Sequence, residues 1–150
     1  MAASRRDIFF VLFQFILFGA YLFEIPSMQL NFPDDANFFN ILLAGAGIAM
    51  IVISMLQLNK NLSPFPTPKQ DGQLVITGLF HYVRHPIYSG ILMTMFFLAI
   101  FYDSGYKLAI TIFMTVLFYY KSGFEEFELE KKFPKYRSYK AGTGRFYPKF

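Results

Sequence analysis

The chain has 150 residues, enough for one domain, but 55% of them are hydrophobic and 16% charged, against about 45–50% apolar and about 25% charged in ordinary soluble domains. This composition excludes a disordered chain and argues against a soluble enzyme, because long apolar runs need lipid as their solvent. The chain contains no Cys, which excludes disulfides and thiolate nucleophiles. It has two His and a net charge of +4. We expect no metal site.

Four apolar segments follow one another along the chain, and each predicts a membrane helix: 8–23, 38–58, 87–102 and 106–120. A span needs about 20 residues at about 1.5 Å each, and only the second segment reaches that length comfortably. The others extend into flanking residues, or the last pair enters the membrane as a tight hairpin around 103–105. We therefore expect an all-α integral membrane protein with about four transmembrane helices, forming one domain over residues 1–150.

Small residues gather on the second segment at Ala44, Gly45, Gly47 and Ala49. Close helix packing in lipid favours such residues, because they let two backbones approach. We expect them to pack against a neighbouring helix.

The charges sort by side if the chain weaves through the membrane. All Lys and Arg residues except Lys107 fall on one face, while Glu24, Asp34, Asp35 and Asp103 fall on the other. By the positive-inside rule the basic face is cytoplasmic, with both termini there. The positive charge is thus a topology signal, with some affinity for anionic lipid head groups, and we expect no nucleic-acid partner.

The polar side chains that could do chemistry lie in the cytoplasmic segment 59–88 and in the tail after Tyr120. Pro64, Pro66 and Pro68 cannot lie inside a helix, so they predict an extended crossing over the membrane face. The stretch 74–76 then reads as a short strand-like or turn piece.

Residues 78–90 form the stretch richest in candidate groups. Arg84 and His85 bring hydrogen-bond donors to the start of the third segment, where Pro86 suits a first helical turn. In a purely structural alternative, Arg84 reaches lipid phosphates and Tyr88 belongs to an interfacial aromatic belt.

The tail that follows Tyr120 has a helical pattern. Its spacing puts Lys121 and Glu125 on one face, directly below the fourth segment. In the alternative interpretation these two residues form an i, i+4 ion pair on a solvated helix, with Glu126 and Glu130 exposed. Tyr136, Tyr139 and the closing 145–148 form an aromatic and basic tail that could lie on the membrane surface.

These two clusters together resemble a known signature. The motif Arg84-His85-Pro86-Ile87-Tyr88, a hydrophobic hairpin and then Glu125-Glu126-Phe127-Glu128-Leu129 resemble the isoprenylcysteine carboxyl methyltransferase family and its phospholipid-methyltransferase relatives. The resemblance covers about residues 59–150, whereas residues 1–58 match only in being two membrane helices.

The resemblance implies a membrane enzyme that binds S-adenosylmethionine at the cytoplasmic side, between the loop before the third span and the tail helix. It implies that the following residues line the cofactor: Gly72, Gln73, Leu74, Val75, Phe80, His85, Pro86, Ile87, Tyr88 and Glu125. It implies that Lys121 contacts the acceptor, supported by Arg84. Two positions depart from the family pattern, Phe80 where Tyr is usual and Gly123 where many bacterial relatives have Arg.

The chemistry of a sulfonium donor agrees with this residue set. The methyl group is already activated, so the protein needs to align the reactants and exclude water, and no Cys nucleophile is required. An ionised carboxylate acceptor would need no general base, and Lys121 could orient it as a point charge. A lipophilic acceptor would enter from the lipid, and the polar cofactor from water.

Two other functions remain open from the sequence. One is a membrane reductase of the sterol-reductase type using NADPH, although such proteins are usually much longer. The other is a non-catalytic membrane protein, an assembly partner or lipid-binding hairpin whose motif residues only anchor it.

Overall fold

A computed structural model describes residues 4–30, 32 and 37–149 of the chain. Its helices are α1 Arg5–Tyr21, α2 Asn37–Leu58, α3 Leu79–Tyr82, α4 Pro86–Phe101, α5 Gly105–Lys132 and α6 Tyr136–Gly142, with short 3-10 turns η1 Pro26–Met28 and η3 Asn59–Asn61. Within these described ranges no strand forms, and only isolated bridges pair extended residues. The expected all-helical fold is confirmed.

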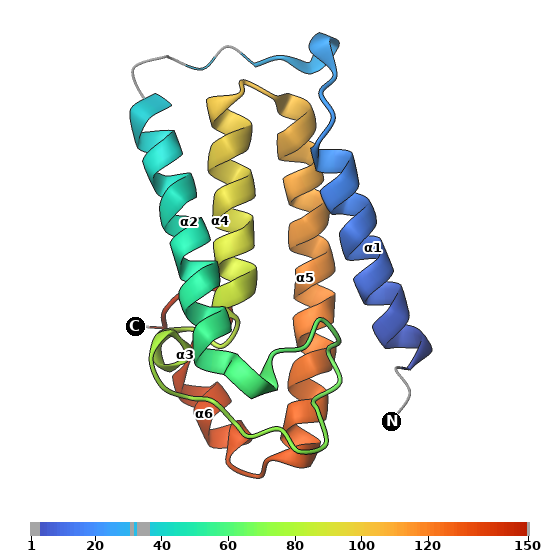
Figure 1. Ribbon diagram of the computed structural model, residues 1–150, viewed down its shortest axis with the longest axis vertical. Helices are drawn as coiled ribbons and strands as arrows, with labels where there is room; N and C mark the ends of the chain where they lie inside the picture. Colours follow the sequence, from blue (N-terminus) through green and yellow to red (C-terminus); the bar gives the residue numbers. More distant parts are fainter. Residues whose placement is uncertain (1–3, 31, 33–36, 150) are drawn as a thin grey trace.

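The four long helices lie side by side in the order α2, α4, α5, α1 (Figure 1). Thus α4 packs between α2 and α5, and α1 packs on the other side of α5. The segment 59–78, α3 and α6 gather at one end of this row, together with the start of α1. Segments far apart in the sequence therefore meet at that end.

Local signals explain where the helices begin. Ser4 and Asp7 form a capping box at the start of α1, with hydrogen bonds of 2.9 and 3.1 Å between side chain and backbone. The expected hairpin forms at 103–105, where Asp103 takes a φ of +50° and the Ser104 hydroxyl caps α5. α5 then continues without a break to Lys132, so the fourth segment and the tail are one helix of 28 residues.

Small residues let α2 and α4 approach closely. A Cβ added at Gly47 would lie 2.8 Å from the Gly90 carbonyl oxygen, and one added at Gly90 would lie 2.7 Å from that of Gly47. Ala44 is buried beside them, whereas Gly45 and Ala49 are exposed. The packing prediction is confirmed for Ala44 and Gly47 and is wrong for the other two, which point away from α4.

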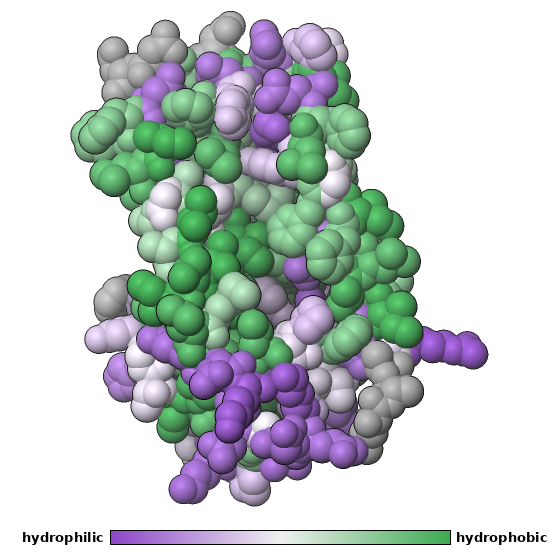
Figure 2. Space-filling model, viewed as in Figure 1, coloured by the Kyte–Doolittle hydropathy of each residue, from purple (hydrophilic) through white to green (hydrophobic). Residues whose placement is uncertain are grey.

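The surface agrees with a membrane environment around part of the row. Large apolar side chains such as Phe9, Leu56 and Ile112 are exposed, and Figure 2 shows a band of hydrophobic surface above a polar lower end. Among the described helices, α2 continued by η3 is long and apolar enough to cross a membrane, with a mean hydropathy of 2.3, while α4 is apolar but shorter. One span candidate is therefore clear, and the expected four are not established.

At the opposite end of the row, Lys107 is buried. Its ammonium donates to the Tyr21 carbonyl at 2.9 Å and lies 3.5 Å from Glu24. These contacts fasten the end of α1 to the start of α5. Asp34 and Asp35, placed on this side by the sequence analysis, lie outside the described residues.

Candidate functional site

A cavity of about 400 Å³ lies where the two polar clusters of the sequence meet. Its walls come from the helices α1 to α6 and from the segment 61–75. Every residue singled out by the sequence as a site residue lines it: Gly72, Gln73, Leu74, Val75, Phe80, Arg84, His85, Pro86, Ile87, Tyr88, Lys121 and Glu125. The fold thus brings two motifs that are distant in sequence to one site.

The proline-rich segment forms one wall and is held by hydrogen bonds. The Thr67 hydroxyl donates to the Asp7 carboxylate at 2.8 Å, and the backbone N–H of Gln73 donates to Asn61 Oδ1 at 2.7 Å. Lys132 donates to the carbonyl of Gln70 at 2.9 Å. The stretch 74–76 forms neither strand nor helix. This wall therefore depends on contacts with α1, η3 and α5.

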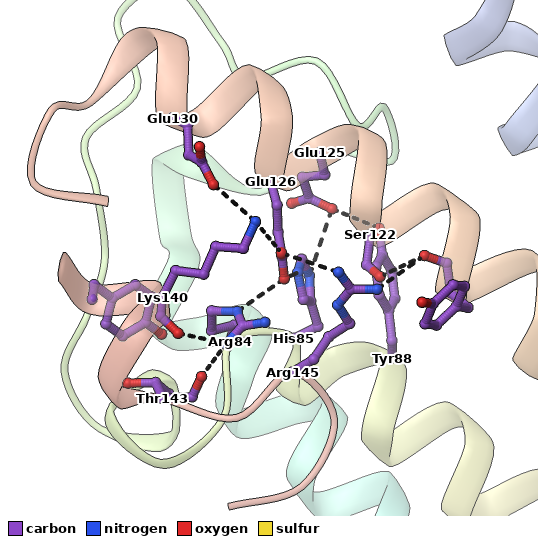
Figure 3. A network of polar contacts seen from close by, with 12 residues as sticks. Arg84, His85, Tyr88, Ser122, Glu125, Glu126, Glu130, Lys140, Thr143 and Arg145 are labelled. Carbon is purple, nitrogen blue, oxygen red and sulfur yellow. Dashed lines mark hydrogen bonds and ion pairs between the residues drawn. The ribbon is translucent and has the colours of Figure 1, made fainter. Parts of the chain in front are cut away.

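His85, Tyr88 and Glu125 form a cluster of polar side chains on the cavity wall (Figure 3). The Tyr88 hydroxyl donates to Glu125 Oε2 at 2.9 Å, and His85 Nδ1 lies 3.7 Å from the same oxygen. The rings of His85 and Tyr88 stack with centroids 5.3 Å apart. The Glu125 side chain is 28% exposed, so its carboxylate remains accessible to a ligand.

Beside the cavity, the fully buried Glu126 carboxylate is surrounded by four basic side chains. Its oxygens lie 2.9 Å from Arg84 Nε, 3.2 Å from His85 Nε2, 3.2 Å from Lys140 Nζ and 3.3 Å from Arg145 Nη2. Burial alone would raise the pKa of Glu126, but hydrogen bonds from His85 and Arg84 outweigh it and hold the pKa far below its usual range. The alternative in which Glu126 is exposed is wrong.

Arg84 fastens the tail to the start of α4. Its guanidinium donates to the carbonyls of Lys140, at 3.1 Å, and Thr143, and its backbone N–H donates to the Gly144 carbonyl at 2.8 Å. The side chain is only 9% exposed. The alternative in which Arg84 reaches lipid phosphates is therefore wrong, and its contacts suit a residue that shapes the cavity.

Lys121 has an unusual environment for a charged side chain. The residue is 1% exposed, its ammonium donates to Gln14 Oε1 at 2.6 Å and it lies 5.4 Å from the centre of the Tyr88 ring. The i, i+4 ion pair with Glu125, which belonged to the alternative interpretation of the tail, is not formed. Burial lowers the pKa of Lys121, while the more distant charges of Glu125 and Asp7 act the other way.

Several cavity residues were not predicted from the sequence. Gln14 is the one polar side chain between Asp7 and Tyr21, a signal that could have pointed to it. Tyr136, assigned to a surface tail, is 2% exposed, and its hydroxyl has no hydrogen-bond partner among the described residues. The Tyr139 hydroxyl, in contrast, donates to the Phe80 carbonyl, and burial raises its pKa to about 12.

Fold and site together describe an all-helical protein with a clear candidate for a membrane span, α2, and a cavity of mixed polarity at the end of its helix row. The model of the family described as "Protein of unknown function (DUF1295)" matches residues 2–143, and the chain belongs to this family. No curated protein matches the sequence. The family description gives no activity, so the activity must be argued from the site.

Proposed function

We propose that the protein is an integral-membrane methyltransferase that uses S-adenosylmethionine on a small lipophilic acceptor, in the manner of the isoprenylcysteine carboxyl methyltransferases. The observation that supports it is the convergence of the two motifs, around His85 and Glu125, on one cavity. Its volume of about 400 Å³ falls in the range of about 300–1,000 Å³ typical of small-molecule sites.

We further propose that α1, α2, α4 and the first part of α5 all lie in the membrane, with the cavity and both termini at the cytoplasmic face. α2 has the length for this, and the exposed apolar side chains of α1 and α5 would be costly in water. The basic residues gather at the cavity end, as the positive-inside rule requires.

The residues of the cavity fit the proposed cofactor. The accessible Glu125 carboxylate can accept from ribose hydroxyls or from an ammonium group. The Tyr136 hydroxyl is buried and has no partner in the part of the chain that the structure describes, a state that costs about 1–3 kcal/mol unless a ligand relieves it. The rings of Phe80 and Phe133 offer apolar faces for a base or a sulfonium.

The chemistry that bound S-adenosylmethionine supplies is an activated methyl group with sulfur as the leaving group. The chain's residues then have to bind, orient and exclude water. Glu125 holds the donor, Arg84 keeps His85 and the tail in place, and Lys121 directs an electron-rich acceptor from the apolar side near Ile91. A carboxylate acceptor is already nucleophilic when ionised and would need no general base.

Calorimetry on purified protein in detergent tests the proposal. S-adenosylmethionine and its demethylated product should bind, and Glu125→Gln should weaken binding by about 10–100-fold, as expected for hydrogen bonds to a charged group. Glu128→Gln is the matched control, because Glu128 lies on the same helix and, among the described residues, its ion pair is with Lys131. Absence of binding, or equal binding by Glu125→Gln, would refute the proposal, and titration with NADPH tests the reductase alternative on the same samples.

A further inference from the structure

The first helix, α1, carries polar side chains at regular seven-residue intervals. Asp7, Gln14 and Tyr21 are two helical turns apart and so lie on one face of α1. The buried Leu17 lies on the same face, which packs against α5. The resemblance to known methyltransferases does not extend to this helix, so the function proposed above assigns no role to its polar residues.

Each of the three polar residues bonds a different part of the protein. Asp7 accepts from Thr67 in the proline-rich wall, at 2.8 Å. Gln14 accepts from Lys121 at 2.6 Å, and Tyr21 donates to the Met95 carbonyl at 2.5 Å. The first two contacts reach residues that line the cavity, while neither Tyr21 nor Met95 lines it.

The contact between Gln14 and Lys121 is the informative one. An ammonium group has three donors and needs acceptors when buried. Within the described part of the chain, no carboxylate lies within 4.0 Å of the Lys121 ammonium, and Gln14 Oε1 is its hydrogen-bond acceptor. A neutral amide therefore holds this cation at the cavity wall without cancelling its charge.

We propose that Gln14 is a positioning residue of the site: it fixes the Lys121 ammonium at the cavity wall and so sets which head-group charge the lipophilic acceptor can carry. The description of that ligand as an acceptor rests on the proposed methyltransferase function. The contact itself is tested with ligands that need no methyl donor.

Two substitutions at Gln14 separate its possible contributions. Gln14→Leu removes the acceptor, and Lys121 is then drawn toward the charges of Glu125 and Asp7, away from its present position. Gln14→Glu keeps a hydrogen bond but makes an ion pair, which neutralises the cation. Both changes should reduce the attraction for an anionic head group, and Gln14→Glu provides a folded variant should Gln14→Leu fail to fold.

The experiment compares dodecanoate and dodecylamine, which share a chain length and differ in head-group charge. Binding is measured by calorimetry on protein in nanodiscs of uncharged lipid, so that partition into lipid is the same for every variant. Wild type should prefer dodecanoate by at least about tenfold, and each Gln14 variant should lose about tenfold in dodecanoate affinity. Tyr21→Phe, the matched control on the same helix face, should lower thermal stability and leave the preference unchanged.

The inference is overturned if wild type shows no preference, if the Gln14 variants retain it, or if Tyr21→Phe loses it equally. The demethylated cofactor is titrated into wild type and into the Tyr21→Phe control, whose substituted residue does not line the cavity, and should bind both proteins equally. Loss of cofactor binding in both proteins, with the dodecanoate preference intact, would refute the methyltransferase proposal and support the role of Gln14.

Discussion

Replacing Glu126 by Gln removes the negative charge that binds four basic groups. The magnitude depends on how buried each partner is. Lys140 and Arg145 are 37% and 24% exposed and can turn toward water, so each contributes little. Arg84 and His85 are 9% and 5% exposed and would be left beside a neutral amide. Breaking a buried pair costs about 3–5 kcal/mol, and since the amide retains one acceptor, we expect about 3 kcal/mol.

Thermal unfolding in detergent measures this effect. For a chain of about this length, 1 kcal/mol corresponds to about 2–4 °C, so the midpoint should fall by about 6–12 °C. Glu130→Gln is the control, because Glu130 pairs with Lys140 at 2.8 Å but is 24% exposed, and it should cost less than about 1 kcal/mol. Equal effects of the two substitutions would contradict the central role of Glu126.

The same carboxylate predicts a dependence on pH. Because the pKa of Glu126 is lower in the folded than in the unfolded state, its contribution is complete above the unfolded pKa of about 4.3 and is lost as pH falls. Wild type should therefore lose more stability than Glu126→Gln between about pH 5 and pH 3. Parallel loss in both proteins would show that Glu126 is not held ionised.

Two further pairs of substitutions test the packing and the cavity. Gly90→Ala should destabilise the protein by about 1–3 kcal/mol, because the added Cβ would lie 2.7 Å from the Gly47 carbonyl oxygen. Gly123→Ala should stabilise it by about 0.5–1 kcal/mol, because a Cβ there would meet nothing within 4 Å and alanine is the better helix former. Chemical denaturation compares the free energies of unfolding of the two variants. Tyr136→Phe should raise the melting temperature and weaken binding of the demethylated cofactor, because it removes an unpartnered hydroxyl. Tyr139→Phe should lower the melting temperature, because its hydroxyl donates to Phe80. A Tyr136→Phe variant less stable than wild type would show that the hydroxyl has a partner in the protein.

The long helices could be predicted from the sequence because apolar runs are local patterns, whereas the residues of the cavity were implied by the resemblance to a methyltransferase signature. Apolar runs bounded by Pro86 and by the turn at Ser104 specify where α4 and α5 begin. The two motifs could be assigned to one site because each lies on a helix of the hairpin, α4 or α5, at the same end of the helix row. The resemblance to a known signature implied that they meet.

Other features depend on long-range contacts that leave no local pattern. The charged run from Glu125 to Lys132 is typical of a solvated helix, and Glu126 differs from its neighbours only because Arg84 and the tail reach it. Gln14 and Lys121 are separated by 107 residues, and their contact requires α1 to pack on α5 at one rotation. Tyr136 is buried because α6 folds back under the cavity, which an aromatic tail does not by itself specify.

The most direct test of the central claim is photoaffinity labelling with a photoactivatable S-adenosylmethionine analogue, followed by peptide mapping. Our account predicts labelling that the demethylated cofactor prevents, on the cavity segments 72–75, 80–88 and 125–139. Labelling confined to other segments, or labelling that excess demethylated cofactor leaves unchanged, would contradict the assignment of this cavity as a methyl-donor site.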